Sequence, residues 1–166
     1  MLTITQVTDY DINDFGFIHS ASWHATYKNI ASDDFLSHFT PQNRAAVFKE
    51  AIKNSNERFY IAKLNNESIG ILILDYYPEG EDEYVGEIKA LYLLPDYWGK
   101  GYGIEMMNFA ISDFTSLKKT KVILWVLEKN LRARHFYEKY GFKFDGQTKI
   151  INIGNNEIEM KYYLNL

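Results

Sequence analysis

The chain has 166 residues, of which 46% are hydrophobic and 24% are charged, and its formal net charge is −4. This length and composition predict a single folded domain over residues 1–166 with an apolar core of its own. The absence of cysteine excludes disulfides, thiolate metal sites and a cysteine nucleophile. The acidic balance disfavours a nucleic-acid partner, because such binding needs a basic surface.

The sequence also bears on location. It has no uninterrupted apolar run of about 18 residues, the length that a membrane-spanning helix needs. Its first residues, MLTITQVTDYDIND, lack the basic start and the apolar block of a signal peptide. We therefore expect no membrane partner and a cytoplasmic location.

The first third of the chain predicts one strand and two helical regions. Residues 2–8 alternate apolar and polar side chains, as a half-buried strand does. A helix follows to about residue 28, with Asn13 or Asp14 as its cap. A second helical region runs from residue 32 to about residue 54 and is interrupted near Pro41.

The middle of the chain predicts three strands. Segments 58–65 and 68–77 are rich in β-branched and aromatic residues and are separated by a short polar turn, which favours a hairpin. The acidic loop 78–84 follows. The next strand covers residues 86–94 and ends at Pro95, since proline removes a donor from the sheet.

The last third predicts two helices and three strands. A helix begins at Gly103 or Ile104 and ends near residue 115, and a second helix is capped by Asn130 and ends at Tyr140. The strands cover residues 121–128, 142–153 and 158–166. The whole order predicts an α/β fold (α+β) with a mixed central sheet of about seven strands flanked by about four helices.

Three glycines at alternate positions, Gly99, Gly101 and Gly103, stand between a strand and a helix. Glycine lets the backbone come close to a ligand, and N–H groups at the start of a helix favour an anion such as phosphate. A flexible turn is the alternative. A dinucleotide fingerprint is excluded because Ile104 and Met106 stand where it needs glycine, and no phosphate loop of the nucleotide hydrolases is present.

The segment LYLLPDYWGKGYG resembles the acetyl-CoA signature of the GNAT superfamily of N-acetyltransferases, [QR]-x-x-G-x-[GA] after a strand. Gly101 and Gly103 match this signature, while Trp98 stands where glutamine or arginine is usual. Downstream, NLRARHFYEKYGF matches a second motif of the superfamily at every position. The matching residues are Asn130, Ala133, Tyr137, Gly141 and Phe142.

The resemblance implies the GNAT fold, with two central strands splayed apart at the acetyl-CoA site, and acetyl-CoA as the cosubstrate. It places the pantetheine on the backbone of one splayed strand and the pyrophosphate on the glycine loop. The resemblance also favours a homodimer, an assembly that is common in the superfamily. The implied cofactor contacts are Leu91, Tyr92, Leu93, Trp98, Gly99, Lys100, Gly101, Tyr102, Gly103, Ile104, Asn130 and Ala133.

Two residues are candidates for the catalytic acid and base. The resemblance makes Tyr137 the acid that protonates the departing thiolate, and a phenol suits this donation because its pKa lies near that of a thiol. Glu87 matches the glutamate base of histone-type members. The alternatives are core packing for Tyr137 and an exposed surface carboxylate for Glu87, with a water taking the base role.

The acceptor follows least directly from the sequence. Trp23 and Tyr27 share a helix face and predict, by the resemblance, an aromatic wall over the acceptor, with Asp75 or Glu87 beside it; core packing is the alternative. An aromatic wall with a carboxylate suits a cation, which favours a small, polyamine-like amine. A peptide or protein amine, a non-catalytic acyl-CoA-binding regulator and a nucleotide-binding module remain open. No metal site is expected.

Overall fold

The computed structural model describes residues 1–166 and contains one seven-stranded mixed sheet with the order β1-β2-β3-β4-β5-β7-β6. The strands are β1 (Leu2–Gln6), β2 (Arg58–Leu64), β3 (Glu67–Asp75), β4 (Val85–Leu93), β5 (Lys121–Leu127), β6 (Lys143–Asn152) and β7 (Asn156–Asn165). The helices are α1 (Ile12–Tyr27), α2 (Asp33–Ser37), α3 (Pro41–Asn54), α4 (Tyr102–Ser116) and α5 (Leu131–Tyr140). The predicted fold class is confirmed.

Several predicted boundaries were wrong by a few residues. The expected cap of α1 at Asn13 or Asp14 is incorrect. A short 3-10 turn follows Thr8, and α1 begins directly after this turn at Ile12. The region 32–54 forms two helices because Thr40 caps a new helix with Pro41 in its first turn.

None of the helices combines the length and the apolar character that crossing a membrane requires.

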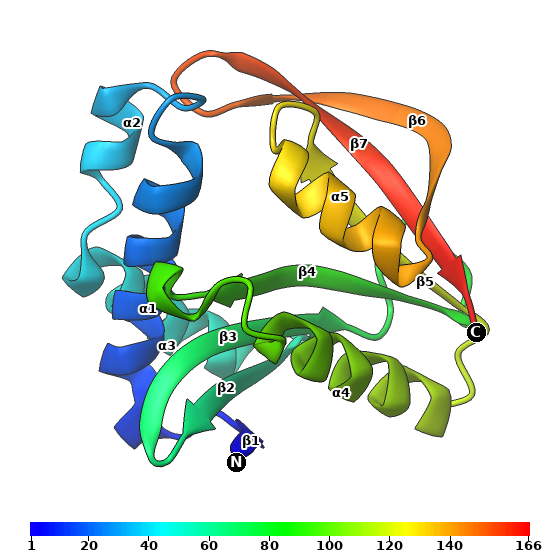
Figure 1. The fold of residues 1–166 in the computed structure, drawn as a ribbon, viewed down its shortest axis with the longest axis horizontal. Coiled ribbons are helices and arrows are strands. Elements are labelled where there is room, and N and C mark those ends of the chain that lie inside the picture. The colour runs from blue at the N-terminus through cyan, green and yellow to red at the C-terminus, as the bar shows by residue number, and fades with distance from the viewer.

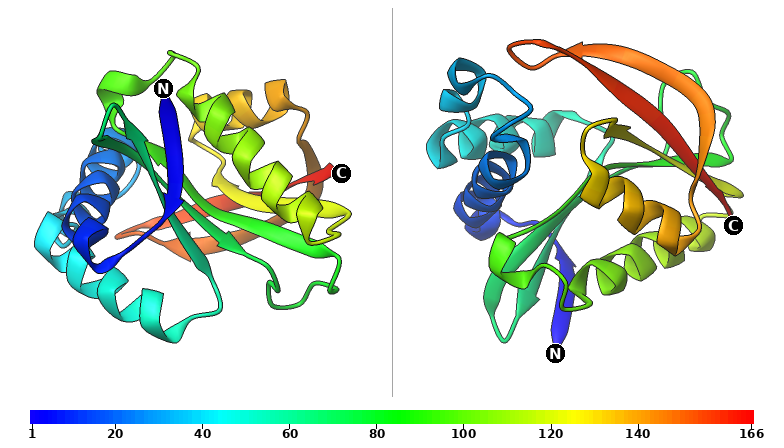
Figure 2. Two further views of the ribbon diagram at one scale, coloured as in Figure 1. Left: turned by 90° about the horizontal axis from the view of Figure 1, so that it is seen from below. Right: turned by 45° about the horizontal axis from the view of Figure 1, so that its top comes forward.

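Both faces of the central sheet are covered. Figure 2 shows α1 and α3 on one side of the sheet and α4 and α5 on the other. The continuous apolar run of β3 follows from this arrangement. Its residue Ile71 packs with Phe15 of α1, whereas the neighbouring Leu72 points to the other face and belongs to the core cluster that contains Met106 of α4.

The sheet divides between β4 and β5. These parallel strands pair only from Val85 to Glu87, opposite Lys121–Ile123. Beyond that point β4 stays with β3 as far as Leu93, while β5 stays with β7. Figure 1 shows the two strands diverging, with α5 beside the opening. The splayed strands that the resemblance implied are therefore present.

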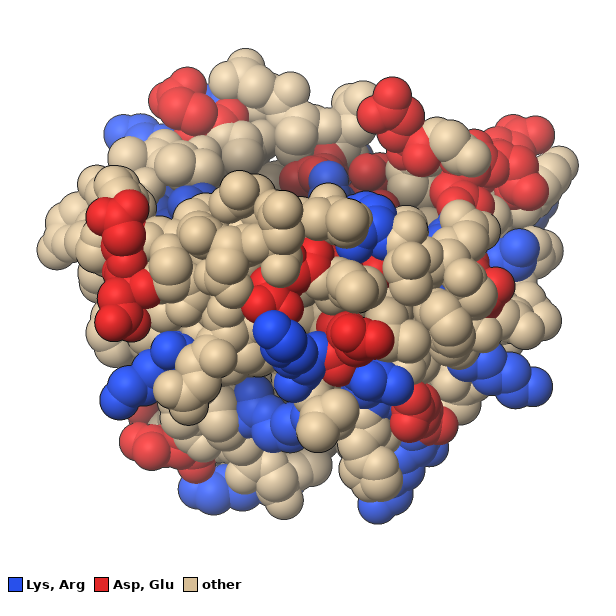
Figure 3. All heavy atoms as spheres, turned by 90° about the horizontal axis from the view of Figure 1, so that it is seen from above, with Lys and Arg blue, Asp and Glu red and all other residues tan.

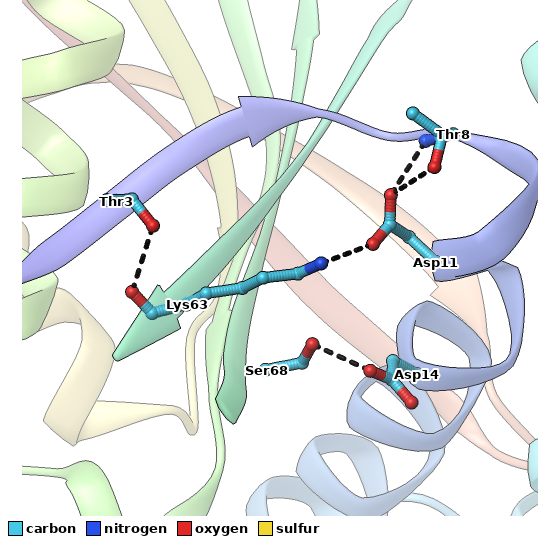
Figure 4. A network of polar contacts seen from close by, with 6 residues as sticks. All are labelled: Thr3, Thr8, Asp11, Asp14, Lys63 and Ser68. Carbon is cyan, nitrogen blue, oxygen red and sulfur yellow. Dashed lines mark hydrogen bonds and ion pairs between the residues drawn. The ribbon is translucent and has the colours of Figure 1, made fainter. Parts of the chain in front are cut away.

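A network of polar contacts fixes the start of α1 against the sheet (Figure 4). The Asp11 carboxylate accepts hydrogen bonds from Lys63 Nζ at 2.6 Å and from the Thr8 hydroxyl and N–H at 2.7 and 2.9 Å. Burial acts to raise the pKa of Asp11, but the hydrogen bonds from Lys63 and Thr8 outweigh it and lower the pKa. Ser68 of β3 adds a hydrogen bond to Asp14 at 2.7 Å. Because these contacts place α1, they also place the residues that its far end presents at the opening.

The loop after α1 touches the turn between β6 and β7. The Ser32 N–H donates to the Ile153 carbonyl at 3.1 Å, and the Asn155 amide donates to the Ile30 carbonyl at 2.9 Å. Gly154 has φ +88° in this turn, and a Cβ there would lie 1.6 Å from the Ser32 hydroxyl oxygen. Only glycine fits so close an approach. The two segments thus meet next to the opening between β4 and β5.

Candidate active site

A cavity of about 190 Å³ lies where β4 and β5 separate. Its walls come from both strands, from the end of α1, from the start of α5 and from the β6–β7 hairpin. The lining residues are Trp23, Thr26, Tyr27, Ile88, Lys89, Ala90, Leu91, Tyr92, Trp125, Val126, Leu127, Asn130, Arg132, Ala133, Tyr137, Ile151 and Glu159.

The structure brings together seven of the residues that the sequence singled out. Residues of α1, β4 and α5 that are far apart in the chain all line this cavity, namely Trp23, Tyr27, Leu91, Tyr92, Asn130, Ala133 and Tyr137. The segment 98–104 does not line it and instead forms the connection from β4 into α4. Glu87 and Asp75 lie in a neighbouring hollow. Sequence reasoning missed Arg132, Thr26, Glu159 and Trp125.

The edge of β4 that faces the opening offers backbone groups. The Leu94 N–H donates to the Ile69 carbonyl of β3 at 2.9 Å, so the alternation of a strand turns the Leu93 N–H towards the opening. The Leu93 carbonyl already accepts from the Trp98 indole at 2.8 Å and from the Ser22 hydroxyl at 3.2 Å. The backbone group that Leu93 can offer to a ligand is therefore its N–H donor.

A bulge in β4 bends the strand at the point of divergence. The pairing with β3 moves from Ile73 opposite Ala90 to Leu74 opposite Ile88, so Lys89 has no partner residue. Such an extra residue bends its strand and increases the local twist. Lys89 itself pairs with Glu57 at 2.5 Å.

Three tyrosines meet in the cavity. The hydroxyls of Tyr27 and Tyr92 lie 3.2 Å apart in a hydrogen bond. Burial raises the pKa of all three, Tyr27, Tyr92 and Tyr137, and the field of Tyr27 adds to the effect on Tyr137. Arg132 opposes it only in part. The Tyr137 phenol therefore stays protonated at neutral pH, as a proton donor must.

Asn130 and Trp23, two further predicted residues of the cavity, make structural contacts. Asn130 caps α5 by accepting from the Ala133 N–H at 3.2 Å, and its side chain also lies within hydrogen-bonding reach of the Tyr27 hydroxyl. Trp23 packs against Phe39 at 4.3 Å and Tyr27 at 4.5 Å between ring centroids. Its indole N–H is buried without a hydrogen-bond partner, although such groups are normally paired.

The hollow beside the cavity is acidic. It contains four carboxylates and two lysines, together with Trp125 and three polar or aromatic neighbours; the charged groups are Glu57, Asp75, Glu79, Glu87, Lys89 and Lys149. Lys89 and Trp125 line both the hollow and the cavity. Figure 3 shows side chains of both signs meeting at a hollow on the face that forms the top of Figure 1.

Glu87 is half-buried and faces Asp75 directly across the β3–β4 pair. Burial raises the pKa of Glu87, and the charges of Asp75 and Glu57 raise it further, whereas Lys89 and Lys149 lower it. A carboxyl with a raised pKa takes up a proton more readily than an exposed glutamate does. Glu87 can therefore act as a base towards an amine in the hollow.

Two of the three loop glycines are required by the backbone. Gly99 and Gly101 have φ +72° and +92°, and a Cβ at either would meet nothing within 4 Å. Gly101 caps α4, so the N–H groups of Tyr102 and Gly103 lie in the first helical turn without helical partners. Gly103 has no positive φ; a Cβ there would lie 3.4 Å from Phe136. No group of three or more His, Asp or Glu side chains is arranged to hold a metal ion.

Comparisons with known proteins agree on one family. The model of the acetyltransferase (GNAT) family matches residues 23–142. An uncharacterized N-acetyltransferase of Methanocaldococcus jannaschii is 26% identical over 145 residues, which cover 85% of this chain and 60% of that protein. The chain thus spans about three fifths of this relative's length. A probable spermine N(1)-acetyltransferase of Bacillus subtilis subsp. natto is 30% identical over 48% of this chain and 55% of its own.

Solved structures share the fold. The paiA N-acetyltransferase from Thermoplasma acidophilum, crystallised in complex with coenzyme A, superposes with a TM-score of 0.76 at 20% identity. The match covers 97% of this chain and 98% of that one. At this identity the likeness concerns the fold alone.

The glycine loop yields a test with a matched control. Gly101→Ala and Gly80→Ala each place a Cβ at positive φ in open space, φ being +92° and +81°. We expect each to lower the free energy of unfolding by about 1–2 kcal/mol. Only Gly101→Ala should also weaken the binding of CoA, measured by isothermal titration calorimetry, since only it disturbs the N–H groups at the start of α4. Equal CoA affinity in the two variants would contradict a role of this loop in binding.

Proposed function

The chain belongs to the acetyltransferase (GNAT) family, and we propose that it transfers an acetyl group from acetyl-CoA to a primary amine of a small, cationic acceptor. The observation that carries this proposal is the cavity between β4 and β5, which has an open strand edge on one side and the Tyr137 phenol on the other. The family membership supports acetyl-CoA as the donor, and coenzyme A is bound in the Thermoplasma structure of the same fold.

Acetyl-CoA would lie along the open edge of β4. The backbone of Leu91, Tyr92 and Leu93 would pair with the pantetheine as a further strand does. The loop from Gly99 to Ile104 would hold the pyrophosphate through its N–H groups and the positive end of α4. Asn130 lines the opposite wall of the cavity, where its side-chain amide would contact the pantetheine.

The reaction is a direct displacement. The amine nitrogen attacks the thioester carbonyl, a C–N bond forms, and the C–S bond breaks. A backbone N–H on the open edge of β4 donates to the carbonyl oxygen as negative charge develops there. Glu87 takes the proton of the amine, directly or through a water, and Tyr137 protonates the departing thiolate. No covalent enzyme intermediate is required, and the chain has no cysteine that could form one.

The charge of the hollow supports a cationic acceptor. Asp75 and Glu87 are directly opposite on adjacent strands, where two like charges repel and destabilise the sheet. Lys89 is already paired with Glu57, so an ammonium group of the acceptor would compensate the other two carboxylates. One relative is described as a probable spermine N(1)-acetyltransferase, which agrees with a polyamine-like acceptor.

Two alternative functions would place different requirements on the acceptor and on the catalytic residues. Acetylation of a peptide or protein amine would require the same chemistry with a longer acceptor. A non-catalytic acyl-CoA-binding regulator would not need Glu87 or the Tyr137 phenol.

A homodimer and a cytoplasmic location stay predictions from the sequence.

The acceptor is tested by thiol release from acetyl-CoA with and without spermidine. Because the protein lacks cysteine, every new thiol comes from CoA. We expect release that depends on spermidine, and an increase of KM for spermidine of about tenfold in Asp75→Asn, the loss of one charge-assisted contact. Release with peptides but not with spermidine would contradict the small-cation proposal while leaving the acetyltransferase activity intact.

The base is tested by the pH profile. Glu87 must be ionised to accept a proton, so kcat/KM should rise with pH through its raised pKa, at a pH above the ordinary value of 4.5. Glu87→Gln should remove this acidic limb and lower kcat/KM by about 100-fold. Glu79→Gln, in the same hollow, serves as the control and should keep the limb. An unchanged profile in Glu87→Gln would assign the base role to water.

The acid is tested with two phenol-to-phenyl variants on one helix. Tyr137→Phe should lower kcat by about 100-fold with little change in KM, since the proton is needed only as the thiolate departs. Tyr140→Phe removes a hydroxyl that donates to Asn108 at 2.7 Å outside the cavity and should keep kcat within about threefold. Equal kcat values in the two variants would rule out Tyr137 as the acid.

A further inference from the structure

Arg132 connects the start of α5 to α1 and to the segment that follows β4. It lies in the first turn of α5, and its guanidinium carbon is 3.1 Å from the centroid of the Trp98 ring, which follows β4. One guanidinium nitrogen donates to the Thr26 hydroxyl of α1 at 3.4 Å. The side chain, which lines the cavity, therefore contacts two segments besides its own helix.

No carboxylate balances this charge. The ion pairs of the structure all involve lysines, and Arg132 is in none of them. The charged or ionisable groups nearest to it are the phenols of Tyr27 and Tyr137, which are neutral at physiological pH because burial raises the pKa of each. An exposed guanidinium that is oriented by an aromatic ring and lacks an anionic partner is well suited to bind an anion.

The position of Trp98 indicates where on the protein such an anion would bind. It stands where the family signature usually has glutamine or arginine, and its indole N–H is used by the Leu93 carbonyl at 2.8 Å. The indole therefore supplies neither a charge nor a free donor to the phosphates. Gly99 follows it directly, and the loop from Gly99 leads into the first turn of α4. A cation on the face of Trp98 thus lies next to the expected pyrophosphate site.

The next arginine on α5, Arg134, makes different contacts. The Arg134 guanidinium donates to the Tyr162 hydroxyl at 3.2 Å and to the Glu128 carbonyl at 2.9 Å. Both contacts fasten α5 to β7 and to the end of β5, and Arg134 does not line the cavity. The two arginines therefore differ in surroundings while sharing a helix and a charge.

We propose that Arg132, oriented by stacking on Trp98, binds the pyrophosphate of CoA and supplies the side-chain contact that the signature has lost at position 98. Guanidinium forms paired hydrogen bonds with phosphate oxygens, and these charge-assisted contacts are stronger than those of neutral donors. The proposal rests on CoA binding by this family and not on the identity of the acceptor.

The test compares ligands that contain or lack the pyrophosphate. Dissociation constants are measured by isothermal titration calorimetry for CoA, 3′-dephospho-CoA and pantetheine. Arg132→Gln, which keeps a planar group that can stack on Trp98, should weaken CoA and 3′-dephospho-CoA by about tenfold or more and leave pantetheine within about twofold. Arg132→Lys, which keeps the charge but not the fork, should lose less than Arg132→Gln.

Arg134→Gln is the matched control and should bind all three ligands as the parent does. Circular dichroism and the melting temperature of each variant establish that it is folded. Unchanged CoA affinity in Arg132→Gln would overturn the proposal, and so would an equal loss for CoA and pantetheine. A loss for CoA that disappears with 3′-dephospho-CoA would assign Arg132 to the 3′-phosphate and overturn the pyrophosphate assignment. None of these outcomes depends on turnover, so they stand apart from the test of the acceptor.

Discussion

The separation of β4 from β5 is the constraint on which the rest of the site depends. Two parallel strands that pair for three residues and then part leave unpaired backbone groups on both edges, and such groups are costly unless they find partners. The protein keeps the strands apart by pairing β5 fully with β7 and β4 with β3, with a bulge at Lys89 where the strands diverge. A ligand that can pair like a strand then satisfies the open edge, as pantetheine amides can.

Burial shifts the pKa of the proposed base and that of the proposed acid in the same direction. It raises the pKa of Glu87 above the ordinary carboxyl value, and it raises the pKa of Tyr137 above that of a free phenol. The starting values lie far apart, near 4 and near 10. The phenol of Tyr137 keeps its proton at neutral pH. The same desolvation thus favours proton uptake in the hollow and proton retention in the cavity.

The sequence predicted most elements because their signals are local. Apolar alternation, prolines and glycines fixed the seven strands and the start of α4 to within a few residues, whereas the true start of α1 depends on the contact of Asp11 with Lys63 of another strand. The splay came from the family motifs and not from periodicity, since nothing in the residues of β4 shows where pairing stops. Arg132 was missed for the same reason: its neighbour Trp98 is distant in the chain, and only the fold brings the two together.

The boundary between the hollow and the cavity constrains how an acceptor can bind. Trp125 lines both, and Lys149 already lies over its ring at 4.1 Å and pairs with Glu159 at 3.3 Å. A cationic acceptor therefore cannot use this indole face without displacing Lys149, and Lys89 is held by Glu57. The carboxylates of the hollow that form no ion pair with a lysine are Asp75, Glu79 and Glu87, and of these Asp75 and Glu87 face each other across the β3–β4 pair. An ammonium group bound between Asp75 and Glu87 would direct a neighbouring amine past Trp125 towards the thioester, and under the proposed function this acidic pair would then serve both to recognise the acceptor and to supply the base.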